Sequence, residues 1–283
     1  DLVRSRGLGD VYKRQEIERR IMITMQNVRK KYKDFELELS LEIPEGRITG
    51  FVGKNGAGKS TAIKLILGLV KPDAGKICVF GNEGGELPAA VKQKIGVSLT
   101  EAGFSSQFTV EDVWHILAKM YPDFQKDFFD QKCEALKLPR KKKLKEFSTG
   151  MKAKLRVLTA ISHKADLLIL DEPTAGLDPS GRDEILDLVA KLHKERNLTV
   201  ILVSHSMEDV ARYVERLIVM NHGTVAFDAT PGEVFSHYKE LEKIGLMAPQ
   251  VTYVMEGLAR RGVTLPHNAI TVQEAVDSIL QAR

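Results

Sequence analysis

The stretch GKNGAGKST, residues 53–61, places the strongest constraint on how this chain can fold. It fits the pattern G-x-x-x-x-G-K-[ST], whose fixed positions are Gly53, Gly58, Lys59 and Ser60. A mostly apolar stretch at 48–52 leads into it, and a helical pattern at 62–69 follows. This order of strand, glycine loop and helix suits a phosphate cradle, because backbone N–H groups and the positive end of the helix dipole then face an anion. A glycine-rich turn that matches by chance is the alternative, and the flanking segments count against it.

The pattern also gives the loop residues separate roles. The Lys59 ammonium is placed to reach the β- and γ-phosphates of a nucleotide, and the Ser60 hydroxyl is placed to ligate Mg²⁺. We therefore predict a nucleotide site that is formed by Gly53, Asn55, Gly56, Gly58, Lys59, Ser60 and Thr61.

Composition narrows the class of protein. The chain has 283 residues, enough for one or two domains, and its 43% hydrophobic and 28% charged residues are typical of a soluble globular protein. No run approaches the roughly 20 apolar residues of a membrane span, so we expect a membrane role only through partner chains. Cys78 and Cys133 show no pairing or metal spacing, which favours a reducing cytosol. The net charge is +4, and the basic run at 140–145 is interpreted as a solvated helix end; no nucleic-acid partner is expected.

The first residues stand apart from the remainder. Residues 4–15, RSRGLGDVYKRQ, resemble a translated sequencing-adapter read-through. A disordered N-terminal extension is the alternative, and on either interpretation we expect no packing from residues 1–20.

From residue 21 the patterns alternate between strands and helices. Apolar residues alternate with polar ones over 35–43, which indicates a half-buried strand. Further strands are predicted at 48–52, 77–80, 95–99, 167–170, 199–203, 217–220 and 224–227. Helices are predicted at 110–120, 127–136, 182–192, 232–244, 251–260 and 272–280. Strand, helix and strand in this order favour an α/β class with a parallel core sheet, into which 100–144 inserts helices.

Two consecutive carboxylates end the hydrophobic strand at 167–170. Asp171, at the strand tip, is placed to hold Mg²⁺ through water, opposite Ser60. Glu172 points differently, because successive residues of a strand face opposite sides, and it can orient and deprotonate a water for attack on a γ-phosphate. An acidic turn after a core strand is the alternative.

Three short segments make the chain recognisable. EPTAGLD at 172–178, FSTGM at 147–151 and VSH at 203–205 together resemble the Walker B end with D-loop, the signature and the switch histidine of ATP-binding-cassette (ABC) ATPases. The resemblance covers about residues 22–228. It implies an α/β phosphate-loop NTPase fold with a parallel core sheet, an N-terminal antiparallel β subdomain, a helical insert subdomain at about 101–160 and a C-terminal helical extension at 231–283, with the ABC ATPase domain at 21–230.

The same resemblance implies site residues outside the phosphate loop. Tyr32 matches the aromatic that stacks on adenine, with a rim residue over the sheet edge as the alternative. Ser148 and the Gly150 backbone would contact the γ-phosphate across a head-to-tail pair of cassettes; an ordinary N-cap is the other role open to Ser148. His205 would contact the γ-phosphate and link it to Glu172, and a satisfied surface histidine is its alternative. ATP and Mg²⁺ are the expected cofactors.

The chain departs from the family pattern at two places. The signature is usually Leu-Ser-Gly-Gly-Gln, and Phe147, Thr149 and Met151 differ here, as in exporter-associated cassettes. Thr149 costs backbone freedom at a phosphate-facing turn. Thr100 and Glu101 stand where the family places the Gln of its Q-loop; Glu101 could ligate Mg²⁺ or a water. Residues 104–114 are expected to form part of the groove for a membrane partner's coupling helix.

From residue 180 onward, the segments SGRDEIL at 180–186, VSHSMEDVARYVERLIVMNHG at 203–223 and ELEKIGLMAPQVTYVM at 240–255 resemble a different subclass, the ATPase subunits of energy-coupling-factor vitamin transporters. A spliced assembly of two sequences is one hypothesis for this mixed resemblance. The implied partners are a second ABC ATPase subunit and integral-membrane transporter subunits, with the chain peripheral at the cytoplasmic face of the cell membrane. We expect ATP-driven uptake of a small molecule, a vitamin or a metal ion, with export as the alternative. A soluble ABC ATPase that acts on ribosomes or DNA is disfavoured, because one phosphate loop and one signature are found.

Overall fold

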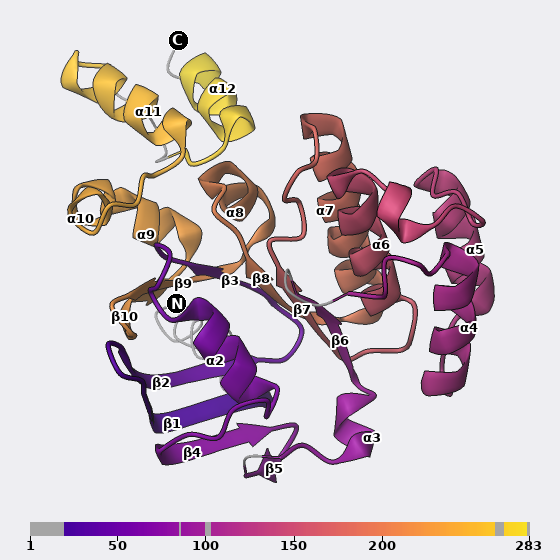
Figure 1. Cartoon of the computed structure of the whole chain (residues 1–283). Helices are drawn as coiled ribbons and strands as arrows, with labels where there is room; N and C mark the ends of the chain where they lie inside the picture. Colours follow the sequence, from indigo (N-terminus) through magenta and orange to yellow (C-terminus); the bar gives the residue numbers. More distant parts are fainter. Residues whose placement is uncertain (1–19, 85, 100–102, 264–268, 282–283) are drawn as a thin grey trace, which may run out of the picture.

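A computed structural model describes residues 20–84, 86–99, 103–263 and 269–281 of the chain. The structure therefore does not describe residues 1–19, Thr100 or Glu101, and the interpretations given for them above concern residues outside the described ones. Within them, two β-sheets stand at an angle with helix α2 (Lys59–Ile66) between them, and helices α4 to α8 (within residues 110–213) lie on the outer side of the larger sheet (Figure 1).

The smaller sheet is antiparallel and comes from the first part of the chain. Its strands lie in the order β2 (Glu36–Pro44), β1 (Ile21–Lys31), β4 (Ala74–Val79) and β5 (Asn82–Glu83). The alternation in β2 is confirmed, because Leu37, Leu39, Leu41 and Ile43 are all buried while the residues between them are exposed. One face of this sheet therefore belongs to the core and the other to solvent.

The larger sheet carries the phosphate loop. Its order is β10 (Thr224–Ala229), β9 (Arg216–Asn221), β3 (Ile48–Val52), β8 (Thr199–Val203), β7 (Leu167–Asp171) and β6 (Ile95–Ser98). All neighbours pair in parallel except β10, which forms the predicted hairpin with β9. Because parallel strands share one carboxyl edge, the ends of β3, β7 and β8 lie together there.

Helix α2 (Lys59–Ile66) is the helix between the two sheets. Its residues Ala62, Ile63, Leu65 and Ile66 are buried. Each buried Ile or Leu side chain contributes roughly 1.5–3 kcal/mol relative to exposure. The helix begins three residues earlier than its apolar pattern predicts, directly after the glycine loop, so the loop is fixed at both ends by buried structure.

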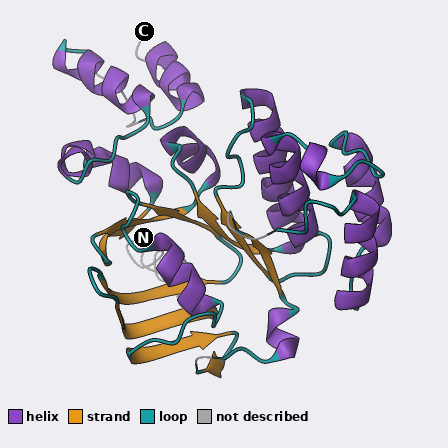
Figure 2. Ribbon diagram, viewed as in Figure 1, coloured by secondary structure: helices purple, strands orange, loops and turns teal. Residues whose placement is uncertain are grey.

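The other face of the larger sheet is covered by helices (Figure 2). These are α4 (Val110–Met120), α5 (Lys126–Ala135), α6 (Thr149–Ile161), α7 (Pro179–Arg196) and α8 (Met207–Tyr213), with α3 (Ala89–Lys92) and the 3₁₀ turn at Leu144–Glu146 as short connections. The sequence patterns did not predict α3, α8 and β5, which are too short to show a period. Among the described residues, no helix has the length and apolar character that crossing a membrane requires.

The C-terminal part is helical, as predicted, with one difference. The stretch predicted as a single helix at 232–244 forms two, α9 (Pro231–Ser236) and α10 (Tyr238–Lys243), and α11 (Gln250–Arg260) and α12 (Val272–Gln281) follow. The Ser236 hydroxyl donates to the Glu233 carbonyl at 2.6 Å, the acceptor that the His237 N–H would use in a continuous helix. The His237 N–H instead donates to Val234 O at 3.1 Å, and the helix breaks there.

Candidate functional site

A cavity of about 710 Å³ opens at the carboxyl edge of the larger sheet, over the phosphate loop. It joins the loop between β3 and α2 to the ends of β7 and β8. Most of the predicted site residues line it together: Asn55, Gly56, Gly58, Lys59, Ser60, Thr61, Asp171, Glu172 and His205. Segments more than 140 residues apart in the sequence thus meet in one cavity.

Lys59 is the buried cation of this cavity, with 8% of its surface exposed. Its Nζ donates to the carbonyl oxygens of Gly53 at 2.5 Å and Lys54 at 3.2 Å. Burial lowers the pKa of the Lys59 ammonium, and the charges of Glu172 and Asp171 oppose that effect. A Cβ at Gly53 would overlap the carbonyl oxygen of Met220, so only glycine allows the loop to leave β3 this close to β9.

Glu172 and His205 face each other across the cavity. Glu172 has a φ of 48°, and its backbone N–H donates to Val203 O at 3.1 Å, which turns the residue off the end of β7. Its Oε1 lies 3.3 Å from His205 Nε2, but without hydrogen-bond geometry, and this buried oxygen has no hydrogen-bond partner among the described residues. Burial, with the Asp171 charge next in importance, raises the pKa of the Glu172 carboxyl to about 7. A water molecule is a suitable partner for this oxygen.

The oxygens around the loop fit a magnesium ion that is shared with phosphate groups. The Ser60 hydroxyl and the Asp171 carboxylate both line the cavity. Within the described part of the chain no cluster of three or more Asp, Glu, His or Cys side chains could hold a metal. Mg²⁺ characteristically binds one or two carboxylates and completes its shell with substrate phosphates and water, which is the set of ligands that this cavity offers.

Tyr32 lies beside the cavity, at its rim. Its side chain is 42% exposed, and its ring centroid is 6.3 Å from that of Phe35, which does line the cavity. The sequence pattern placed Phe35 in the half-buried strand predicted at 35–43 and did not assign it to the site. His222, in the β9–β10 turn, is a second lining residue that the motifs did not indicate.

Ser148 and Gly150 do not line this cavity; they form the start of α6. The Ser148 hydroxyl caps the helix by accepting from Met151 N at 3.2 Å, so the N-cap interpretation is confirmed. A Cβ at Gly150 would lie 3.0 Å from Leu177, so the signature segment packs against the 172–178 segment of the same chain.

Thr149 stands where the family signature usually has glycine, and its side chain has a packing role that the sequence did not indicate. Gly176 has a φ of 75°, and a Cβ built there would lie 2.6 Å from the Thr149 methyl carbon. The methyl group therefore covers Gly176 at contact distance. The extra side chain of Thr149 joins the two segments.

A second cavity, of about 400 Å³, lies between the larger sheet and helices α4 and α6. Phe104 and Ser106, from the stretch expected to form a groove, line it together with Tyr121, Arg156 and His163. The rings of Tyr121 and His163 stack with centroids 4.1 Å apart. That this cavity belongs to a groove for the coupling helix of a membrane partner stays a prediction.

Comparison with known proteins agrees with this geometry. Residues 37–175 match the family described as ABC transporter. The chain is 35% identical over 255 residues to the energy-coupling factor transporter ATP-binding protein EcfA2 of Clostridium tetani, covering 86% of this chain and 88% of that protein. It is 36% identical over 256 residues to the protein of the same name from Clostridioides difficile, covering 86% and 89%.

Solved structures share the fold. The cbiO1 protein from Clostridium perfringens, described as part of the ABC transporter complex cbiONQ, gives a TM-score of 0.64 at 25% identity and covers 83% of this chain and 99% of that chain. The dimeric post-hydrolysis cassette MJ0796, bound to ADP and Pi, gives 0.66 at 23% identity and covers 74% and 99%. Relatives this similar over most of both chains show the family, and the chain belongs to the ABC transporter ATP-binding proteins, the ATP-hydrolysing cassettes.

Proposed function

We propose that this chain is the ATPase subunit of an energy-coupling-factor type uptake transporter. The observation that carries the catalytic part is the single cavity in which Lys59, Asp171, Glu172 and His205 meet. The similarity to proteins named EcfA2 supports the transporter type. The chain would work at the cytoplasmic face of the membrane through partner subunits that span it.

The geometry suggests how the residues divide the hydrolysis of ATP. Glu172 Oε1 would orient a water for in-line attack on the γ-phosphorus and accept its proton, for which a carboxyl pKa near 7 is suited. Lys59 and His205 would hold the γ-phosphate oxygens. Ser60 and Asp171 would hold Mg²⁺, which when bound neutralises charge on the phosphates. The bond from the γ-phosphorus to the bridging oxygen breaks, and ADP and phosphate leave.

A second cassette would complete the site. Ser148 lies at the N-terminus of α6 and does not line the cavity of its own chain. A helix N-terminus with free N–H groups binds an anion well, so in a head-to-tail pair the α6 start of one chain could contact the γ-phosphate in the other. The solved cassette MJ0796, whose fold this chain shares, is described as dimeric and bound to ADP and Pi.

The direction of transport and the cargo are part of the same proposal. The relatives match 86% of the chain, a stretch long enough to contain both the FSTGM segment and the residues after 180. That continuity favours uptake of a vitamin or a metal ion over export, even though FSTGM is similar to the signature of exporter-associated cassettes.

The test combines turnover with partner identification. The purified chain should hydrolyse ATP in a Mg²⁺-dependent way. A pull-down from the membranes of its source should recover integral-membrane subunits, which mass spectrometry identifies. Recovery of ribosomal proteins or DNA-repair proteins instead would contradict the transport proposal.

A further inference from the structure

The turn between β9 and β10 brings a histidine to the ATP cavity. Its two residues, His222 and Gly223, have φ values of 46° and 82°. Positive φ at both positions is typical of a type I′ hairpin turn, for which Asn-Gly, Asp-Gly and Gly-Gly are the preferred pairs. Glycine at position 222 would therefore form the same hairpin. His222 lines the cavity, although the turn does not require its imidazole.

Contacts on both sides of the turn fix where it lies. The Gly223 N–H donates to the Ala57 carbonyl of the phosphate loop at 3.1 Å, and the Gly223 carbonyl accepts from Glu38 N of β2 at 2.8 Å. A Cβ at Gly223 would overlap the carbonyl oxygen of Glu36, so only glycine allows this approach. The turn is therefore held between the phosphate loop and the start of β2.

The side of the cavity beside the start of β2 is aromatic. Asp34 and Phe35, which precede β2, line it. The Phe35 ring lies over the phosphate loop, because a Cβ at Gly58 would be 3.1 Å from its Cζ, and its centroid is 6.3 Å from that of Tyr32. Since the proposed site places the phosphates at Lys59, this aromatic side is left for the sugar and the base of the nucleotide.

His222 brings a hydrogen-bond donor to the same side. Phe35 has no polar group in its side chain, and the ionised Asp34 carboxylate only accepts hydrogen bonds. A neutral imidazole has one N–H donor and one acceptor nitrogen. The hydroxyl and amino groups of a nucleoside, and its ring nitrogens, are suitable partners for both.

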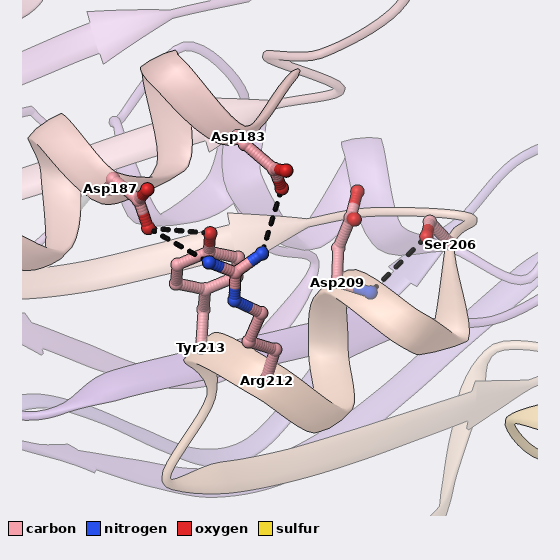
Figure 3. Close-up of polar contacts among 6 residues, drawn as sticks. All are labelled: Asp183, Asp187, Ser206, Asp209, Arg212 and Tyr213. Atoms are coloured by element: carbon pink, nitrogen blue, oxygen red, sulfur yellow. Dashed lines mark hydrogen bonds and ion pairs between the residues drawn. The ribbon is translucent and has the colours of Figure 1, made fainter. Parts of the chain in front are cut away.

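Other polar side chains near the site are already paired. At the interface of α7 and α8, Arg212 donates to Asp183 at 2.8 Å, and the Tyr213 hydroxyl donates to Asp187 at 2.7 Å (Figure 3). In contrast, the exposed ring of His222 makes no hydrogen bond or ion pair with the described residues. The imidazole is therefore free to bind a molecule that enters the cavity.

We propose that His222 is a nucleotide-binding residue that donates a hydrogen bond to the nucleoside half of ATP. This inference rests on the proposed function, which places the phosphates at Lys59 and the adenine beside Tyr32. His222 takes no part in the attack on the γ-phosphorus, which belongs to Glu172 and His205. It acts on the affinity for the nucleotide and leaves the chemical step unchanged.

ATP affinity and steady-state kinetics of the full chain test this role. His222→Gly removes the imidazole and suits the positive φ, so the hairpin is kept and the thermal unfolding midpoint should not fall. We expect the Kd for ATP from isothermal titration calorimetry to rise by about fivefold, as for the loss of one hydrogen bond. The KM should rise with it, and kcat should stay within about twofold of wild type, because binding alone is changed.

Two further variants serve as rescue and control. His222→Asn keeps a side-chain donor on a residue that tolerates positive φ, and it should recover part of the lost affinity. Lys137 is also exposed, has a φ of 55° and lies outside the lining of the cavity. Lys137→Gly is therefore the same kind of replacement away from the nucleotide, and its Kd for ATP should stay within about twofold of wild type.

Inorganic tripolyphosphate separates the two halves of the nucleotide. It carries the phosphates without sugar or base, so it should inhibit ATP hydrolysis by wild type and by His222→Gly with equal affinity, whereas Lys59→Ala should bind both tripolyphosphate and ATP more weakly. Wild-type affinity for ATP in His222→Gly, or an equal loss for ATP and tripolyphosphate, would overturn the assignment of His222. A wild-type chain that binds no ATP would instead contradict the proposed function itself.

Discussion

The methyl group of Thr149 covers the backbone of Gly176, and this contact joins the signature segment to the segment that follows Glu172. On the proposed dimer, both segments would face the ATP site of the other chain. A threonine in place of the usual glycine then adds a packing contact between the two segments.

Gly176→Ala tests the contact. A methyl group there would lie 2.6 Å from the Thr149 methyl carbon, on a residue with a φ of 75°. We expect the strain to cost on the order of 1–3 kcal/mol of stability and to lower ATP turnover. Thermal unfolding and an ATPase assay measure these effects. Adding Thr149→Gly should recover part of both losses, whereas Gly232→Ala, on a residue without close neighbours, should change neither.

Glu172→Gln should keep ATP binding and abolish turnover. The amide preserves the size of the side chain but cannot accept the proton of the attacking water, so we expect a loss of roughly 10²–10⁴-fold in kcat. The variant should also accumulate as an ATP-bound dimer in size-exclusion chromatography. Exposed Glu111→Gln is the control. Turnover near the wild-type rate would remove Glu172 from the role of base.

Lys59→Ala should weaken nucleotide binding. Lys59 is the one predicted phosphate ligand that carries a positive charge in the loop pattern, and it is held inside the cavity. We expect ATP affinity to fall by at least about tenfold, equivalent to roughly 1.4 kcal/mol. Isothermal titration calorimetry measures the change, with exposed Lys71→Ala as the control. Equal affinity in wild type and Lys59→Ala would place this side chain outside the site.

His163 should make the fold sensitive to acid. Burial lowers the pKa of the His163 imidazole, and the backbone of Ile95 and Thr159 acts in the other direction. The folded state therefore binds a proton at His163 less readily than the unfolded state does. The contribution of neutral His163 to the free energy of unfolding is complete above the unfolded-state pKa of about 6.5, and it is lost as the pH falls below that value.

The measurement is denaturant unfolding of wild type and His163→Phe between pH 8 and pH 5. Phenylalanine keeps an aromatic ring to stack on Tyr121 and cannot titrate. Wild-type stability should fall more steeply with acid than that of the variant. Parallel curves would mean that protonation of His163 is not coupled to unfolding.

The part of the site that the sequence predicted is the part that depends on short motifs. The phosphate loop, Asp171, Glu172 and His205 meet in one cavity because a parallel sheet gathers strand ends at one edge, a consequence of the strand–helix–strand order. The parallel sheet and the β9–β10 hairpin followed from the same patterns.

The remaining features depend on packing between distant segments. Thr149 differs from the usual signature, but only the approach of Gly176 gives it a contact. Helix α8 begins with the same Ser/Thr-x-x-acid pattern as α4 and α9, but there the N-cap N–H donates to the Ser204 hydroxyl and the capping box is not completed, which the pattern does not reveal. The break at His237 is accompanied by a hydrogen bond from the Ser236 hydroxyl to a backbone carbonyl, a local contact that no periodicity records.

Lys59 donates to two carbonyl oxygens of its own loop. An ammonium has three N–H donors, so one remains for an incoming phosphate oxygen while the two loop carbonyls hold the side chain. The ammonium is thus held near its working place before the nucleotide arrives, so little conformational entropy is lost on binding.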